Sequence, residues 1–217
     1  TWTVSQDLLN SAAGELANLS SLSEVGVATT DVMQLFTIQS LAGTFAPVAD
    51  RPTQLRSATR SLFFEPESGT LLVSKEGLKY NDNYQIVSTV IVPSADALRI
   101  SSSSSPPDAQ YLELPQIQEL SQIQQVVDQI IQGSTGNYEK LLAMQSYFRD
   151  NFVYSLDVPD STSGDATIDF LTRKSGYCEQ FSSTFALFAR LIGIPSRVAI
   201  GFTPGEATPK GTSNVQL

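Results

Sequence analysis

The hydrophobic pattern of this 217-residue chain changes at a short tract that cannot itself be buried. Residues 101–105 are all serine, and Pro106 and Pro107 follow. The tract offers no apolar side chain to a core, and its prolines have no backbone N–H to donate. Apolar residues come in short, strand-like runs before it, and after it they recur every three or four positions. We therefore predict an α+β chain with a β-rich domain at residues 1–107 and a helical domain at 108–217.

Turn residues separate the apolar runs of the first half. Four runs are rich in β-branched and aromatic residues, at positions 33–38, 61–64, 70–74 and 84–92. Turn-forming residues stand between them at 67–69 and 81–83. Short strands with such turns predict an antiparallel, sandwich-like or half-barrel domain. Further upstream, the apolar spacing of residues 6–19 predicts an amphipathic helix despite Gly14.

The second half has the spacing of packed helices. Apolar residues from 117 to 131 fall on one helical face, with Pro115 expected in the first turn and Gly133 ending the helix. A second helix is predicted at 138–150, and a short strand at 152–156. The connections are short, so we expect the helices to pack against one another.

Composition excludes several classes of function. Thirteen Lys and Arg face 22 Asp and Glu, and the net charge of −9 disfavours binding to nucleic acid or to anionic lipid. The single cysteine excludes an intrachain disulfide and a zinc site built on paired cysteines. The sequence has no histidine, which excludes H-E-x-x-H metal sites and the usual imidazole base. No apolar run is long enough to span a membrane, and no signal peptide is apparent.

The lone cysteine stands at the predicted start of a buried helix. Gly176, Tyr177 and Cys178 precede an apolar, helically spaced run that ends at Gly193, with Pro195 just beyond. The partial positive charge and free N–H groups of a helix N-terminus favour the thiolate, the form that attacks. The N–H of Cys178 could also face an oxyanion. A cysteine in apolar surroundings can equally be a small buried hydrophobe, and spacing leaves both interpretations open.

Two motifs flank the predicted helix, Gly176-Tyr177-Cys178-Glu179-Gln180-Phe181 and Gly193-Ile194-Pro195-Ser196-Arg197-Val198, with Ala186 between them and Gly201-Phe202 beyond. Together they closely resemble the transglutaminase-like superfamily. Residues 111–115, 152–154 and 169–171 extend the resemblance toward the bacterial, membrane-anchored transglutaminase-like proteins of the TgpA type. Residues 68–71 and 84–88 resemble, more weakly, the extracytoplasmic β domain that precedes the enzyme domain in that group.

The resemblance implies a papain-like fold in which Cys178 is the catalytic nucleophile, served by a histidine and an aspartate on following strands. Neither appears before the sequence stops at Leu217, so we expect a piece truncated before both, inactive by itself. With them, Cys178 would attack a carboxamide or peptide carbonyl to give a thioester. Resolution by an amine is transglutamination and resolution by water is proteolysis or deamidation, a choice that the sequence leaves open. No cofactor is implied, no metal-binding residue is assigned, and metal dependence stays open.

Four neighbouring residues have simpler interpretations. Glu179 and Gln180 suit the first turn of a helix, and we expect structural roles for both. Arg197 follows Pro195 on a predicted strand, where it is expected to pair with a carboxylate. Tyr177 could line a substrate cleft or pack in the core, and the sequence does not decide between these roles.

The family further implies a partner and a location. The parent protein would act on protein or peptide substrates at the extracytoplasmic, periplasmic face of the cytoplasmic membrane, attached through flanking helices absent from this chain. The alternative is a catalytically dead transglutaminase-like scaffold that serves as a binding module at the cell envelope. A third hypothesis is a sandwich domain whose cysteine merely packs. The oligomeric state cannot be predicted.

Overall fold

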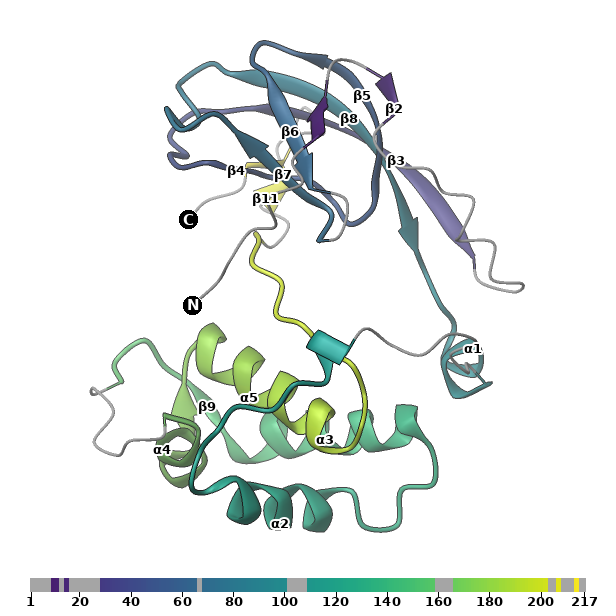
Figure 1. Ribbon diagram of the computed structural model, residues 1–217, viewed down its shortest axis with the longest axis vertical. Coiled ribbons are helices and arrows are strands. Elements are labelled where there is room, and N and C mark those ends of the chain that lie inside the picture. The colour runs from purple at the N-terminus through teal and green to yellow at the C-terminus, as the bar shows by residue number, and fades with distance from the viewer. Residues whose placement is uncertain are drawn as a thin grey trace. The chain divides into compact units, whose positions relative to one another are not determined.

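The computed structural model describes residues 9–11, 14–15, 28–65, 68–100, 109–158, 166–202, 206–207 and 213–214. They belong to two compact units, each described by itself (Figure 1). One unit comprises Thr1–Ala97 with Gly201–Leu217, and the other comprises Leu98–Ile200. The predicted domain boundary after residue 107 lies within 101–108, outside the described residues, and stays a prediction.

The first unit contains two antiparallel four-stranded sheets. One has the order β1 (Leu9–Ser11), β6 (Leu62–Glu65), β7 (Thr70–Val73) and β4 (Phe45–Ala46). The other has the order β2 (Gly14–Glu15), β5 (Pro52–Ala58), β8 (Asn83–Ile91) and β3 (Thr29–Thr37). The four predicted runs fall on β3, β6, β7 and β8. The expectation of a sandwich-like β domain in an α+β chain is confirmed.

Both sheets contribute to one core. Tyr84 and Ile86 of β8 are buried together with Leu62 and Phe64 of β6 and Leu71 of β7. Residues of β8 alternate between buried and partly exposed, as a strand with one face on a core must. The Tyr84 hydroxyl donates to the Pro47 carbonyl at 2.6 Å, so the polar end of this buried ring is satisfied.

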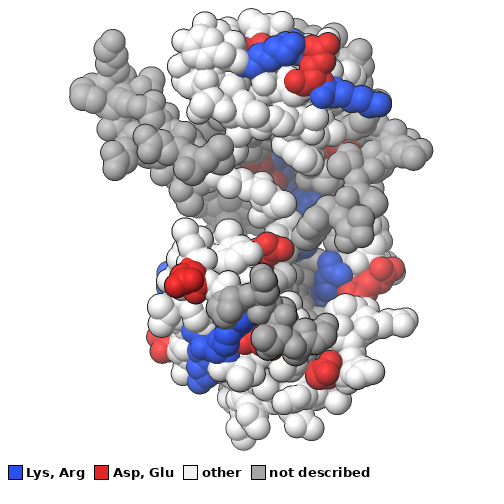
Figure 2. Space-filling model, turned by 90° about the vertical axis from the view of Figure 1, so that its left-hand side faces the viewer, with Lys and Arg blue, Asp and Glu red and all other residues white. Residues whose placement is uncertain are grey.

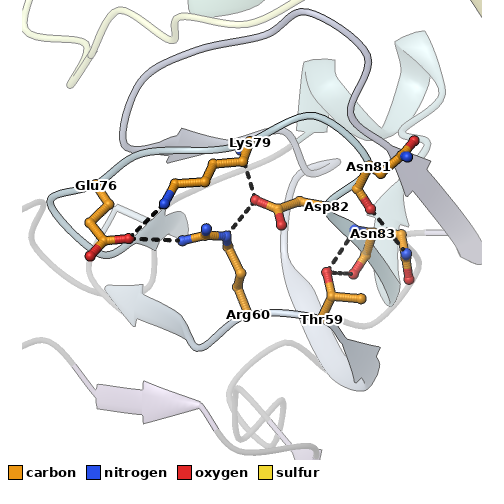
Figure 3. Close-up of polar contacts among 7 residues, drawn as sticks. All are labelled: Thr59, Arg60, Glu76, Lys79, Asn81, Asp82 and Asn83. Carbon is orange, nitrogen blue, oxygen red and sulfur yellow. Dashed lines mark hydrogen bonds and ion pairs between the residues drawn. The ribbon is translucent and has the colours of Figure 1, made fainter.

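A polar network joins the loops that flank β5 and β8 (Figure 3). Arg60 Nε lies 2.6 Å from Asp82 Oδ2, which also accepts the backbone N–H of Lys79 at 2.7 Å. Glu76 accepts from Lys79 Nζ at 2.9 Å and lies 3.7 Å from Arg60 Nη1. The hydrogen bond from Lys79, then the charges of Lys79 and Arg60, hold the pKa of Glu76 below its ordinary value. The predicted turn at 81–83 begins with Asn81 in the left-handed region, at φ 64°.

The helix predicted over residues 6–19 is wrong where the structure describes it. Residues 9–11 form β1 and pair with β6, and residues 14–15 form β2 and pair with β5. Both segments thus satisfy backbone groups in existing sheets, and Gly14 in the middle weakens the competing helix. The remainder of that prediction lies outside the described residues.

The second unit is helical. Its elements are α1 (Ala95–Ile100, which begins in the first unit), a 3-10 turn at Ala109–Tyr111, α2 (Leu120–Ile130), α3 (Asn137–Asn151), α4 (Ala166–Arg173) and α5 (Cys178–Leu191). Two short parallel strands, β9 (Val153–Tyr154) and β10 (Ser175–Gly176), lie among them. β11 (Glu206–Ala207), which pairs with β12 (Ser213–Asn214), belongs to the first unit. No helix of the described segments has the length and apolarity needed to cross a bilayer.

Aromatic rings from three helices fill the core of this unit. The Phe148 ring of α3 lies 5.1 Å from Phe152, 6.0 Å from Phe170 of α4 and 5.4 Å from Phe188 of α5, measured between centroids. Phe170 and Phe188 are fully buried. Because α5 packs against α2, α3 and α4, its first turn is anchored to a rigid core.

Two further predictions in this half are wrong. Pro115 is not in a first turn, because α2 begins at Leu120 and the N–H of Ile117 closes a tight turn onto the Pro115 carbonyl. Residues 194–200, which include Arg197, form no strand. There, the N–H of Ser196 donates to the Tyr111 carbonyl at 3.0 Å, so the backbone is satisfied outside a sheet.

Candidate active site

Cys178 is the first residue of α5 and is exposed. Tyr177 before it has an extended backbone, and its N–H donates to Gln180 Oε1 at 3.0 Å. The side chain of Gln180, the third residue of α5, thus accepts the N–H of Tyr177, the residue just before the helix, and this is half of a capping box. The predicted helix start is confirmed, and the thiol is not a buried apolar group. The role of Cys178 as nucleophile stays a prediction.

The turn that leads to Cys178 leaves no room for a side chain at Gly176. A Cβ at this buried position would lie 2.9 Å from both Cδ2 and Cε2 of Phe170 and 3.2 Å from Gln180 Oε1. Just upstream, Lys174 adopts a left-handed backbone at φ 55°, which turns the chain from α4 into β10. Glycine is therefore needed at 176 because the Phe170 ring and the Gln180 cap close over it.

Parallel pairing brings a distant segment beside this turn. The N–H of Val153 donates to the Lys174 carbonyl at 2.9 Å, and the N–H of Ser155 donates to the Gly176 carbonyl at 2.8 Å. Tyr154 is therefore placed opposite Gly176, two residues before the thiol. Its ring stacks on Phe181, one turn after Cys178, with centroids 6.3 Å apart. Sequence reasoning predicted a strand at 152–156 but not its partner.

The N-terminus of α5 offers free hydrogen-bond donors next to the thiol. Within the described part of the chain, no acceptor binds the N–H of Cys178 or of Glu179. The N–H of Phe181 makes the first bond of the helix, to the Tyr177 carbonyl at 3.2 Å. Unpaired N–H groups and the helix dipole favour negative charge at this position, whether a thiolate or an oxyanion.

The second motif closes the other end of α5. Arg190 donates through Nε and Nη2 to the Ser196 carbonyl, at 3.2 and 2.7 Å, and through Nη1 to the Glu113 carbonyl at 2.7 Å. Ser196 Oγ donates to the Ala186 carbonyl at 2.8 Å. Gly193 ends the helix at φ 78°. Residues 193–196 therefore hold the segment after α5 against the helix and the chain near residue 113.

The remaining candidates have modest roles in the structure. Glu179 is exposed in the first turn, and its carbonyl accepts the Ser183 hydroxyl at 2.6 Å. Gln180 caps the helix, in agreement with the structural role expected for it. Tyr177 is partly buried. Among the residues that can be described, no group of three or more His, Cys, Asp or Glu is placed to hold a metal ion.

Charged side chains of both signs lie on the face of the molecule that Figure 2 shows. On the face shown in Figure 2, Lys and Arg side chains stand next to Asp and Glu side chains. The net charge of −9 is thus not gathered into a single acidic patch on that face. Such a mixed surface gives little long-range steering to a charged ligand.

Comparisons with known proteins find similarity in the part of the chain that contains Cys178. Residues 124–216 match the family model described as the transglutaminase-like superfamily. A protein-glutamine gamma-glutamyltransferase of Pseudomonas aeruginosa is 36% identical over 69 residues, which are 31% of this chain and 10% of that protein. The uncharacterized protein YebA of Bacillus subtilis is 27% identical over 108 residues, which are 48% of this chain and 14% of that protein. The matches thus span a small part of both relatives.

A solved structure shares the fold. The periplasmic domain of TgpA from Pseudomonas aeruginosa, crystallised with ethylmercury, superposes with a TM-score of 0.61 at 20% identity. The superposition covers 85% of this chain and 64% of that one. It therefore includes both the β unit and the helical unit of this chain, and at this level of identity it shows the architecture alone.

Proposed function

We propose, from the match of residues 124–216 to the transglutaminase-like superfamily, that Cys178 is the nucleophile of a cysteine acyltransferase or peptidase. The observation that carries the proposal is the exposed thiol at the first residue of α5, inside the matched range. A thiol there meets the helix dipole and unpaired N–H groups, the surroundings that activate a cysteine.

The proposed reaction has two covalent steps. The Cys178 thiolate attacks the carbonyl carbon of a carboxamide or peptide bond, and the C–N bond then breaks to leave a thioester and an amine that takes up a proton. An incoming amine or water next attacks the thioester carbonyl and releases the thiol. An amine gives transglutamination, whereas water gives deamidation of a side chain or cleavage of a peptide bond.

The first turn of α5 contributes to the first step. As the sulfur attacks, negative charge moves to the carbonyl oxygen, and a preorganised N–H within hydrogen-bond distance of that oxygen stabilises it. The N–H of Cys178 is unpaired in the described structure and belongs to the attacking residue itself. Removing one such donor in other enzymes costs about 10²-fold to 10³-fold in rate.

The proton transfers need a base that these 217 residues do not contain in its usual form, because the sequence has no histidine. General acid–base catalysis commonly contributes about 10²-fold to 10⁴-fold. We infer that the 217 residues alone do not turn over substrate and that the parent protein supplies a histidine, oriented by an aspartate, from outside them. No cofactor takes part in this scheme.

The proposed substrates are proteins or peptides that carry accessible carboxamides. The net charge of −9 argues against nucleic acid. The solved relative is described as a periplasmic domain, which supports a location at the extracytoplasmic, periplasmic face of the cytoplasmic membrane. Attachment through membrane helices of the parent protein, outside this chain, completes the proposal.

The test uses the parent protein with its Cys178→Ser and Cys178→Ala variants. Incorporation of a fluorescent primary amine into a glutamine-containing peptide measures transglutamination, and release of ammonia or of new peptide termini measures hydrolysis. We expect both variants to lose at least about 10³-fold of whichever activity is present, because the nucleophile is removed. Retention of activity in both variants refutes the proposal.

A second measurement needs only the 217-residue chain. We expect iodoacetamide to alkylate Cys178 in the folded chain without denaturant, because the thiol is exposed at the first residue of α5. A reactive thiol combined with a parent protein that shows no Cys178-dependent turnover would instead support the alternative, a catalytically dead scaffold used for binding.

A further inference from the structure

In the described part of the chain, the outer edge of β9 has an unpaired backbone donor and an unpaired backbone acceptor near Cys178. In a parallel pair, successive residues direct their N–H and C=O groups to opposite sides of the strand. The N–H groups of Val153 and Ser155 donate into β10, so the N–H and C=O of Tyr154 point away from it. No hydrogen bond reaches either group from the described residues.

This edge lies close to the thiol. Tyr154 is opposite Gly176, and β10 continues through Tyr177 directly to Cys178. Neighbouring strands are about 4.8 Å apart and each residue advances about 3.3 Å. The backbone of Tyr154 is therefore roughly 8 Å from that of Cys178, and a strand added on the far side of β9 is roughly 12 Å from it. An extended peptide of a few residues covers that distance.

The edge also lacks the features that usually protect an exposed strand. Natural proteins blunt such edges with lysine, proline or a bulge. Residues 153–156 contain none of these, and Asp157 is the first charged residue after them. Their apolar side chains are instead open, since Val153 is 65% exposed, Tyr154 59% and Leu156 77%.

We propose that this edge, defined by residues 153–156, binds an extended segment of the polypeptide substrate as an added strand. The N–H and C=O of Tyr154 pair with the substrate backbone, and the apolar side chains of the edge contact side chains of the substrate. The inference rests on the proposed function and narrows its substrate class to unfolded or extended polypeptide. Backbone pairing holds the substrate whatever its sequence and brings its carbonyl to Cys178.

The probe is a hexapeptide whose central side chain carries a chloroacetamide in place of the glutamine carboxamide. The Cys178 thiolate displaces chloride, a C–S bond forms, and the adduct is counted by intact mass. A matched hexapeptide is N-methylated at the central residues and cannot donate to the edge. Tyr154→Pro removes the outward N–H, whereas Tyr154→Ala removes the ring and keeps that N–H. Cys178→Ser controls for labelling elsewhere.

We expect N-methylation to slow labelling of the wild-type chain and of Tyr154→Ala about fivefold, the value of one hydrogen bond of about 1 kcal/mol. Tyr154→Pro should label with the parent peptide about fivefold more slowly than Tyr154→Ala. The effect of N-methylation should shrink there, because the hydrogen bond that each change removes belongs to the same strand pairing, and the pairing needs both. Equal rates with both peptides on the wild type, or an undiminished methylation effect in Tyr154→Pro, overturn the inference.

Two further readouts separate the possible outcomes. Iodoacetamide needs no strand pairing, so normal alkylation by it together with equal peptide rates refutes this edge and leaves the nucleophile intact. An unreactive Cys178 refutes both proposals together. Amide exchange, which does not require the proline variant to fold, should show Tyr154 N–H becoming protected in the peptide adduct. Protection already present in the parent protein without peptide means that its own chain occupies the edge, and it overturns the inference.

Discussion

Replacing Gly176 with alanine tests the packing that fixes the start of α5. The new Cβ would lie 2.9 Å from two carbons of the Phe170 ring and 3.2 Å from Gln180 Oε1. Phe170 is fully buried and packs on Phe152 and Phe181, with centroids 4.8 and 4.9 Å away, so its ring has little room to retreat. The steric clash must therefore be relieved by a shift of the Phe170 ring, of the Gln180 side chain or of the β10 backbone.

The magnitude follows from three terms. Overpacking a core costs about 1–3 kcal/mol, and losing the hydrogen bond from the Tyr177 N–H to Gln180 costs about 0.5–1.5 kcal/mol. Alanine also lowers the conformational entropy of the unfolded chain relative to glycine, which stabilises the folded state by about 0.4–1 kcal/mol. We expect Gly176→Ala to lower the free energy of unfolding of the helical unit by about 1–3 kcal/mol.

Urea unfolding followed by circular dichroism at 222 nm measures this change, because the signal comes mainly from the helices. Gly201→Ala is the matched control, since Gly201 is exposed and a Cβ there meets no atom within 4 Å. Gly176→Ala combined with Phe170→Leu should cost less than the sum of the two single changes, because the smaller side chain makes room for the new Cβ. A midpoint for Gly176→Ala equal to that of Gly201→Ala would refute the reasoning.

Two other predictions concern polar groups. Arg190→Ala removes the donors to the carbonyls of Ser196 and Glu113 and should destabilise the helical unit by about 2 kcal/mol in the same assay. Arg190→Lys should restore only part of the lost stability, because the lysine ammonium lacks the planar set of N–H donors that a guanidinium has. Tyr84→Phe leaves the Pro47 carbonyl without its donor and should destabilise the β unit by about 1–2 kcal/mol in thermal unfolding. Burial raises the pKa of Tyr84 above its ordinary value, so the stability that its neutral form gives should be full below about pH 10 and fall as the pH rises further. A β unit whose stability is flat above pH 10, or whose loss there is unchanged in Tyr84→Phe, would contradict the assignment.

The sequence predicts those elements whose own residues show which face is buried. β8 has alternating buried residues, and its run of β-branched and aromatic side chains was recognisable. β5 was missed because four of its seven residues are polar, and only Pro52 and Leu55 are buried. Its place in the sheet comes from pairing with β2 and β8, which no local pattern encodes. The same limit explains why residues 9–15 were predicted as a helix.

At the candidate site, too, the sequence predicts the features that depend on neighbouring residues and misses those that depend on contacts between distant segments. A glycine, an aromatic residue and an apolar helical repeat place the start of α5 at Cys178, and the structure agrees. The neighbourhood of Tyr154 could not be predicted, because β9 and β10 are two residues each and lie about twenty residues apart in sequence. Only the fold brings Tyr154 opposite Gly176.

The position of the thiol is thus set by groups that never touch it. Phe170 belongs to the aromatic core, Gly176 lies against its ring, and Gln180 folds back over Gly176 to hold the N–H of Tyr177. Each of these contacts restricts the conformation of the next residue. The first turn of α5 is therefore positioned by the buried core. A thiol held this way has little conformational entropy left to lose. The same contacts make the site sensitive to core substitutions, since a change in the packing of Phe170 reaches Cys178 through two intervening residues.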